Sequence, residues 1–334
     1  MQTWGRTWLS PGKHRSSWPL TPDPWPLIKA QRMIQAKEGR ISTVAVSTAL
    51  GTSGRGIFPY TLLPGYRRLL RAVRETGAAV FAKSATRSKR IGNFIAWNPL
   101  TWKYIRRLPG GGMLNAYGLT NPGAEACARD IKIALDQGFK VIPNLYPEFV
   151  KGTELAILDI LEAVEIYQQI LDPDFWALEL NYSCPNSQEA IRENVAQGLK
   201  CSQAVRAKFP GLFLIAKISI CHPCEFSQDL ERLGINAIHA INTIPYEIIY
   251  PLERSPLWRA GGGGVSGGPA LAAALSYNTK LRKKVRLPLI MGCGVKNRED
   301  VQRYLDVGAD TVSFCTLALR NPGEAAEIVS RFNG

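Results

Sequence analysis

Short apolar runs alternate with longer amphipathic stretches from residue 41 to the end of the chain. Strands buried on both faces of a parallel sheet read as near-continuous apolar runs, whereas helices repeat apolar residues about every 3.6 positions. The pattern predicts helices over 151–171, 188–209 and 269–283. It predicts eight strands, over 42–48, 78–83, 139–144, 175–182, 212–218, 235–242, 288–292 and 310–314.

Eight βα units over roughly 290 residues fit an α/β fold, a (β/α)8 TIM barrel, with a doubly wound sheet as the alternative. Segment 84–121 follows the second strand and far exceeds the roughly 2–6 residues of an ordinary βα connection. We therefore expect an elaborated loop over the C-terminal mouth of the barrel. Residues 1–38 hold four tryptophans without a sustained period. They are an expected N-terminal extension of a catalytic domain at 39–334, either flexible, packed on its surface or touching a membrane interface.

Composition narrows the class of protein. The 334 residues are 46% hydrophobic and 20% charged, as in an ordinary globular protein. Apolar runs stay well below the roughly 20 residues of a membrane span, and no signal peptide is visible. Seven scattered cysteines, an odd number, indicate reduced thiols and a cytoplasmic protein.

The formal charge is +14, with dense basic patches at 67–74, 87–90 and 282–284. Such a surface binds nucleic acid or is a solvated basic face that draws anionic cofactors and substrates. We expect no nucleic-acid partner, because no nucleic-acid motif accompanies the charge. Cys221-His222-Pro223-Cys224 has the form of a thiol redox motif but lacks the second pair of a structural zinc site, so no metal is expected.

Polar residues gather where the predicted strands end. Lys83, Asn144, Asn181, Lys217 and Asn242 each fall at a C-terminal strand end, where barrel enzymes carry their active sites. Five such residues of two anion- and amide-binding types favour an active-site ring over chance strand-end caps.

Two glycine clusters indicate a phosphate site. Residues 261–268 precede the predicted helix at 269–283, and Gly292-Cys293-Gly294 precedes a helix-like stretch at 297–306. Backbone N–H groups and helix N-termini favour anions, and the last two βα units of a barrel are where such sites are built. A flexible loop is the alternative for the first run. Gly262-x-Gly264-x-x-Gly267 matches a dinucleotide fingerprint, but no predicted strand leads into it.

The hexapeptide Asn181-Tyr182-Ser183-Cys184-Pro185-Asn186 places two amides around a thiol directly after a strand. Amides bind a flat polar ligand in fixed directions, and a cysteine near positive charge loses its proton more readily. The alternative is an ordinary turn with a small buried hydrophobe.

Several motifs occur in a fixed order from about Ser42 to the C-terminus. They are Lys83-Ser84-Ala85-Thr86, Arg90-x-Gly92-Asn93, Leu114-Asn115-Ala116-Tyr117-Gly118-Leu119-x-Asn121-Pro122-Gly123, Leu180-Asn181-x-Ser183-Cys184-Pro185-Asn186, Ala216-Lys217, Ile241-Asn242-Thr243, Ser266-Gly267 and Gly308-Ala309-Asp310 with Thr316. In these motifs the chain resembles the dihydroorotate dehydrogenase family of FMN-dependent barrel enzymes.

The resemblance implies FMN at the barrel mouth. Lys217 would face the N1 side of the flavin and stabilise the reduced anion. Other implied contacts with the flavin ring are Lys83, Ser84, Asn144 and Asn181. The implied phosphate ligands are Ser266, Gly267, Gly292, Gly294, Cys315 and Thr316.

The resemblance also implies how dihydroorotate binds and reacts. Oxidation removes a proton from C5 and a hydride from C6, so a base lies on one face of the ring and the flavin on the other. Cys184 stands where the family has this base. The amide edges of the ring would meet Asn115, Asn181, Asn186, Asn242 and Thr243, and its carboxylate would meet Lys83 and the backbone of Tyr117, Gly118 and Leu119.

The implied activity is oxidation of dihydroorotate to orotate in pyrimidine biosynthesis. Departures from the family pattern at 187–190, Val295 and Cys315 leave open a related flavin oxidoreductase that acts on another dihydropyrimidine or a similar ring. A non-enzymatic binding protein on the same scaffold is the third reading. Cysteine at 184 is typical of the soluble branch, which uses fumarate or, through an iron-sulfur partner subunit, NAD; Asn144 is similar to the quinone-using branch, so the acceptor stays open. We expect a homodimer.

Overall fold

Parallel strands close into a barrel. The computed structural model describes residues 33–37, 39–48, 62–183 and 191–334. The strands follow the order β7-β4-β3-β15-β14-β11-β10-β9-β8 and all pair in parallel. Their bounds are β3 (Val44–Ser47), β4 (Ala79–Phe81), β7 (Lys140–Ile142), β8 (Asn144–Leu145), β9 (Ala177–Asn181), β10 (Phe213–Ile218), β11 (Ala237–Ala240), β14 (Leu289–Gly292) and β15 (Thr311–Phe314).

The two edges of this sheet belong to one interrupted strand. β7 pairs with β4 and β8 pairs with β9, while only Pro143, which has no N–H to donate, separates β7 from β8. The Pro143 carbonyl still accepts a hydrogen bond from the Glu179 N–H at 2.9 Å. The barrel is therefore closed, each of the eight predicted strands is present, and the doubly wound alternative is wrong.

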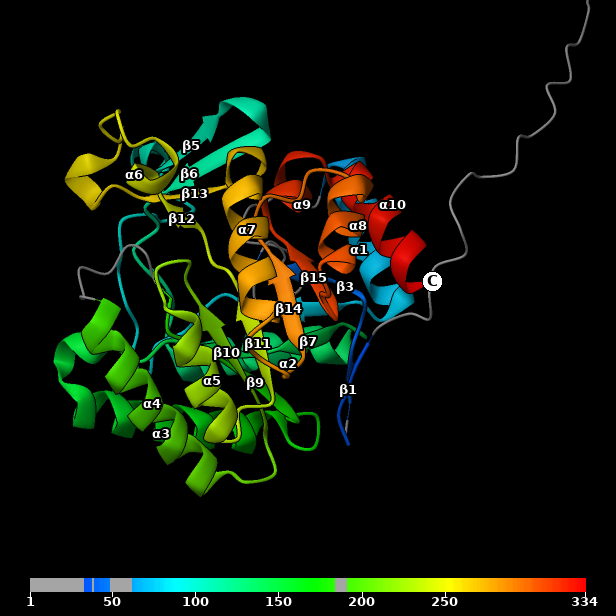
Figure 1. Ribbon diagram of the computed structural model, residues 1–334. Helices are drawn as coiled ribbons and strands as arrows, with labels where there is room; N and C mark the ends of the chain where they lie inside the picture. The colour runs from blue at the N-terminus through cyan, green and yellow to red at the C-terminus, as the bar shows by residue number, and fades with distance from the viewer. Residues whose placement is uncertain (1–32, 38, 49–61, 184–190) are drawn as a thin grey trace, which may run out of the picture. The chain divides into compact units, whose positions relative to one another are not determined.

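Helices surround the barrel (Figure 1). The predicted helices correspond to α3 (Thr153–Leu171), α4 (Ile191–Lys208) and α7 (Leu271–Arg282). The others are α1 (Pro64–Thr76), α2 (Ala124–Asp136), α5 (Cys224–Arg232), α6 (Tyr246–Ile249), α8 (Arg298–Asp306), α9 (Thr316–Arg320) and α10 (Pro322–Asn333).

The alternation of side chains along each strand separates two cores. Val44 and Val46 belong to the large apolar cluster between strands and helices, whereas Ala45 belongs to a small cluster with Phe81 and Ile290. Successive strand residues point to opposite faces, so the small cluster fills the barrel interior. β1 (Ile34–Gln35) and β2 (Arg40–Ile41) form an antiparallel pair, and their isoleucines join that cluster.

The expected elaborated loop is half of a second sheet. Segment 84–121 contributes β5 (Ile105–Leu108) and β6 (Gly112–Asn115), and the chain after β11 contributes β12 (Ile244–Pro245) and β13 (Gly264–Ser266). The four strands pair antiparallel in the order β12-β13-β6-β5. In Figure 1 they lie at one end of the barrel with α6. The sequence did not reveal this sheet, because β13 lies inside the glycine run.

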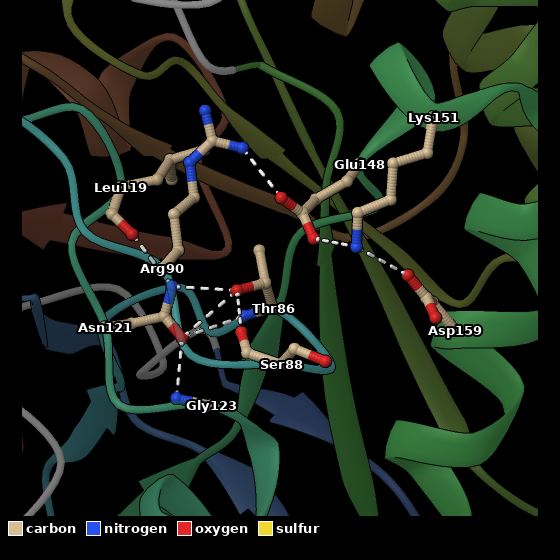
Figure 2. Close-up of polar contacts among 9 residues, drawn as sticks. All are labelled: Thr86, Ser88, Arg90, Leu119, Asn121, Gly123, Glu148, Lys151 and Asp159. Atoms are coloured by element: carbon tan, nitrogen blue, oxygen red, sulfur yellow. Dashed lines mark hydrogen bonds and ion pairs between the residues drawn. The ribbon is translucent and has the colours of Figure 1, made fainter.

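Polar contacts among Thr86, Arg90, Leu119, Asn121 and Gly123, named the polar clasp, hold the two ends of segment 84–121 together (Figure 2). Arg90 and Asn121 exchange backbone hydrogen bonds of 3.0 Å. The buried Asn121 amide donates to the Leu119 carbonyl at 2.8 Å and to the Thr86 hydroxyl at 3.0 Å, and accepts from the Gly123 N–H at 3.0 Å. Arg90 also pairs with Glu148 at 2.7 Å, which ties the clasp to the chain after β8. The backbone at Leu119 is thus fixed beside the barrel mouth.

The Cys221–Cys224 motif precedes and begins α5, outside the barrel interior. Cys221 is exposed, Cys224 is half-buried, and His222 between them is buried. The Ser219 N–H donates to His222 Nδ1 at 2.9 Å, which requires that nitrogen to be unprotonated. Among the described residues, no group of three or more His, Cys, Asp or Glu side chains is placed to hold a metal ion. None of the described helices combines the length and the apolarity that a membrane span needs.

Acidification is expected to destabilise the fold through His222. Burial lowers the pKa of this histidine from 6.5 to about 4, so between these values the unfolded chain binds a proton that the folded chain does not. Stability therefore falls as the pH drops from 6.5 to 4, by up to about 3 kcal/mol from this residue. His222→Asn, which keeps an acceptor near the Nδ1 position, should lose less stability over that range in urea denaturation. An equal loss in both proteins would contradict the assignment.

Candidate active site

A cavity lies at the C-terminal ends of the barrel strands and extends to the four-stranded sheet. Barrel strands and the segments after them supply most of its wall, while Ile105, Met113 and Asn115 come from β5 and β6. Many of the lining residues were predicted from the sequence, and they are Lys83, Ser84, Asn115, Tyr117, Leu119, Asn181, Lys217, Asn242, Thr243, Ser266, Gly267, Gly294, Cys315 and Thr316. Most of the predicted site residues thus converge on one cavity.

A buried ionic network forms the floor of this cavity. Glu179 on β9 is fully buried, with Lys217 Nζ 3.8 Å from its carboxylate. His239 Nδ1 and Asn144 Nδ2 donate hydrogen bonds to the two carboxylate oxygens. Desolvation makes buried charges costly unless they are paired and hydrogen-bonded. This arrangement satisfies one carboxylate with one ammonium and two neutral donors.

The protonation states of the floor follow from burial and charge. Burial disfavours the Glu179 carboxylate, but Lys217 and His239 outweigh burial and lower the pKa of Glu179. Burial lowers the pKa of His239 against the opposing attraction of Glu179. His239 is therefore neutral near pH 7, with a proton on Nδ1 for Glu179, and its Nε2 accepts from the Ser313 hydroxyl at 2.7 Å.

Amide side chains brace the strand ends on one side of the cavity. Asn181 donates to Ser84 Oγ at 2.8 Å and accepts from the Ser183 N–H at 3.0 Å. Asn242 donates to the Ser183 carbonyl at 2.7 Å and accepts from the Thr243 N–H at 2.9 Å. These bonds fix both amides, which leaves their remaining donor and acceptor capacity for a ligand with complementary edges.

Lys83 and Tyr117 face each other across the cavity wall. Lys83 Nζ lies 3.6 Å from the centre of the Tyr117 ring, within the range of a cation–π contact. Burial raises the pKa of Tyr117 to about 12, so the phenol stays neutral. Gly118 does not line the cavity; a Cβ on its neighbour Gly92 would lie 2.2 Å from the Gly118 carbonyl oxygen. Close backbone packing thus sets the course of 117–119.

The glycine clusters and Thr316 meet at the other end of the cavity. Thr316 Oγ1 donates to Ser266 Oγ at 2.8 Å, and Gly267 and Gly294 have φ values of 75° and 99°. A Cβ on Gly267 would lie 2.4 Å from the Gly111 carbonyl oxygen, and one on Gly294 would lie 2.4 Å from Leu271 Cα. Leu271 begins α7, so backbone N–H groups and a helix N-terminus converge where the sequence predicted phosphate.

Two thiols border the same end of the cavity. Burial raises the pKa of Cys293 to about 12 and also raises the pKa of Cys315. The Thr48 hydroxyl donates to Cys315 Sγ at 3.4 Å. Both thiols are therefore neutral near pH 7 and add no negative charge to an anion site.

Some predicted site residues lie elsewhere. Cys184 and Asn186 fall outside the residues that the structure describes. Asn144 is fully buried beneath the cavity wall and contacts Glu179, and its Oδ1 has no hydrogen-bond partner among the described residues. Gly292 also lies behind the wall, where its carbonyl accepts from the Tyr304 hydroxyl at 2.9 Å.

Sequence reasoning missed several lining residues. His239 and Ser313 line the cavity but lie inside strands that read as apolar. Glu179, which contacts His239 behind the lining, was taken only as part of a strand. A polar residue within a fully buried strand is a usable signal, because it demands a partner inside the barrel. Apolar lining residues such as Ile105 and Met113 carry no such signal.

The dihydroorotate dehydrogenase family model matches residues 69–332 of this chain. The chain belongs to this family. The match runs from within α1 to within α10 and includes the motifs around the cavity, so the family predicted from those motifs is confirmed. Its members are oxidoreductases that act on CH–CH donors, which agrees with the predicted class of enzyme.

Relatives and solved structures agree with this placement. The chain is 30% identical over 298 residues to the catalytic subunit of dihydroorotate dehydrogenase B (NAD(+)) of Desulforudis audaxviator, covering 85% of this chain and 86% of that protein. It is 28% identical over 295 residues to the catalytic subunit of the same name from Parabacteroides distasonis, covering 86% and 88%. A structure of DHODH from Eimeria tenella in complex with ferulenol has a TM-score of 0.65 at 17% identity, covering 93% and 86%. The last comparison supports the fold alone.

Proposed function

We propose that this protein oxidises dihydroorotate to orotate with FMN as its cofactor. The observation that carries the proposal is one cavity that joins a glycine-lined anion site, a buried lysine and a set of fixed amides. The relatives named as dihydroorotate dehydrogenase B catalytic subunits support the same substrate.

The residues of the cavity fit FMN. A flavin monophosphate needs an anion site at one end. Ser266, Thr316 and the left-handed turns at Gly267 and Gly294, where a Cβ would clash with neighbouring backbone, would form this cradle. Lys217 would supply positive charge on the N1 side of the flavin, and Glu179 holds its ammonium group in place. When bound, FMN would accept the hydride that leaves the substrate. Lys83, Ser84, Asn181 and the buried Asn144 would orient the ring, and Gly292 and Cys315 would shape the cradle.

The cofactor is tested by release from the purified protein. We expect the heat-released cofactor to run as FMN on chromatography. The proposed anion site lies at one end of the cavity and would hold a single phosphate. Recovery of FAD, or of no flavin after reconstitution with FMN, would contradict the assignment.

The substrate would bind through its amide edges and its carboxylate. Asn115, Asn181 and Asn242 with Thr243 border the cavity. Lys83 Nζ lies over the Tyr117 ring, and a carboxylate would bind to it and to the backbone of 117–119. Asn186 and the proposed base Cys184 complete this set by resemblance. Cys184 would take the C5 proton from one face while the hydride leaves from the other.

Dihydroorotate is expected to reduce the bound flavin at least about tenfold more efficiently than dihydrouracil. A charge-assisted hydrogen bond to the carboxylate contributes roughly 1.5–3 kcal/mol, which dihydrouracil cannot make. Stopped-flow reduction under anaerobic conditions measures both rates. Lys83→Ala should remove most of the preference. Equal or faster reduction by dihydrouracil would favour an oxidoreductase for another dihydropyrimidine, to which Val295 and Cys315 point as departures from the family pattern.

The acceptor of the electrons is proposed from the relatives. Those reported above are catalytic subunits of NAD(+) enzymes, so NAD through a partner subunit is favoured over fumarate and quinone. We further propose a cytoplasmic homodimer. The catalytic domain would begin before β1 rather than at residue 39, because β1 pairs with β2 and Ile34 belongs to the interior cluster of the barrel. Co-expression with a candidate NAD-reducing subunit, followed by size-exclusion chromatography, tests the pairing.

A further inference from the structure

An apolar tip flanked by cations extends from the four-stranded sheet at the edge of the active-site cavity. Residues 97–107, named the 97–107 knob, comprise η2 (Pro99–Tyr104) and most of edge strand β5 with the two residues before η2. Trp97, Leu100 and Trp102 are 85%, 81% and 54% exposed. Neighbouring exposed aromatic and aliphatic side chains on a surface mark an interaction site.

Specific hydrogen bonds hold the knob in shape. Asn98 Oδ1 accepts from the Leu100 N–H at 3.1 Å and caps η2. Thr101 Oγ1 accepts from the Ile95 N–H at 2.9 Å, and Trp102 Nε1 donates to the Ala96 carbonyl at 3.0 Å. The apolar side chains are therefore presented by an ordered scaffold.

Positively charged side chains surround the apolar tip, and no acidic residue lies near them in the sequence. Lys103, Arg106 and Arg107 are exposed, and none of them pairs with a carboxylate of the described residues. Arg106 and Arg107 are adjacent on a strand, so they flank the tip on opposite faces of the sheet. Residues 76–124 contain seven lysines and arginines and no aspartate or glutamate.

We propose that the 97–107 knob docks on the surface of a lipid bilayer that contains anionic headgroups. Tryptophan and leucine enter the boundary between headgroups and acyl chains, while lysine and arginine meet the negative surface. A second copy of the chain is a less suitable partner for the knob. A two-fold interface there would bring the same three cations of each copy together, and residues 76–124 contain no carboxylate to pair with them. A protein partner needs roughly 20–30 residues per side, more than this knob offers.

Docking of the knob brings the active-site cavity to the bilayer. Ile105 belongs to the knob and lines the cavity, so the mouth opens beside the docked surface. The docking itself does not require any activity.

Flotation of the full chain with vesicles tests the docking. We expect binding to vesicles of phosphatidylglycerol and phosphatidylcholine and little binding to phosphatidylcholine alone. The triple variant K103Q/R106Q/R107Q should weaken apparent affinity on the order of 100-fold, and W97S/L100S should weaken it at least about tenfold. All five side chains are exposed, so thermal melting should stay unchanged.

A matched control removes equal charge elsewhere. K280Q/K283Q/R286Q changes three exposed cations at the end of α7 and after it, and should bind within about twofold of the original chain, since cations beyond a Debye length contribute little. Equal flotation of K103Q/R106Q/R107Q and the original chain would overturn the proposal and place binding elsewhere, for example in residues 1–32. Equal binding to both vesicle types, or loss of a dimer by W97S/L100S in light scattering without vesicle binding, would overturn it too.

Discussion

Cys184→Ala is expected to leave the protein yellow while slowing reduction of the bound flavin by dihydroorotate at least ~10²-fold. A positioned base contributes roughly 10²–10⁴-fold to such a step, and the residue lies immediately beyond Ser183, whose backbone the amides of Asn181 and Asn242 fix. A thiol with a pKa near ~8.5 is mostly protonated at pH 7, so part of the rate depends on nearby positive charge. Anaerobic stopped-flow absorbance measures the reduction.

Two further cysteine variants separate the base from other effects. Cys184→Ser should keep some activity with its pH optimum moved upward, because a hydroxyl ionises less readily than a thiol. Cys221→Ala changes an exposed thiol outside the cavity and should reduce the flavin at the original rate. Unchanged reduction by Cys184→Ala would remove this residue from the mechanism.

Lys217→Met is expected to lower the free energy of unfolding by about 3–5 kcal/mol, because removing one partner of a buried ion pair leaves an uncompensated charge. The Glu179 carboxylate is fully buried and would keep only the neutral donors of His239 and Asn144. Urea denaturation measures the loss. The double variant Lys217→Met/Glu179→Gln should recover most of the stability, since it removes the carboxylate as well.

Measuring FMN binding separates two roles of Lys217, which are to neutralise Glu179 and to bind the flavin. The double variant should fold but bind FMN at least about tenfold more weakly, because it lacks the cation that would face the N1 side of the flavin. Fluorescence titration of the apo protein measures this affinity. A double variant that binds FMN as tightly as the original chain would limit Lys217 to neutralising Glu179.

The barrel could be predicted because its strands are short and mostly apolar and alternate with amphipathic stretches, and each one is present in the structure. The second sheet could not. Its strands are two to four residues long and come from segments about 130 residues apart, and β13 consists of Gly264, Val265 and Ser266 within a glycine run. Pairing partners rather than intrinsic propensity decide such strands.

The candidate site also has a part that the sequence predicts and a part that it does not. Lys83, Lys217 and the asparagines stand at strand ends, where barrel geometry alone brings them to one mouth. The floor depends on which side chains meet across the barrel, and the pairing of His239 with Glu179 and Ser313 joins residues 60 and 74 positions apart. No spacing rule in the sequence encodes that pairing. The same limit applies to Asn144, which the strand-end pattern put on the cavity wall and the structure puts behind it.

Anaerobic titration of the purified, FMN-loaded protein with dihydroorotate tests the central claim most directly. The proposed function predicts that the visible flavin absorbance bleaches as dihydroorotate is added and that one orotate forms for each flavin reduced. Persistent yellow colour with excess dihydroorotate, in a protein that chemical reductant still bleaches, would contradict it.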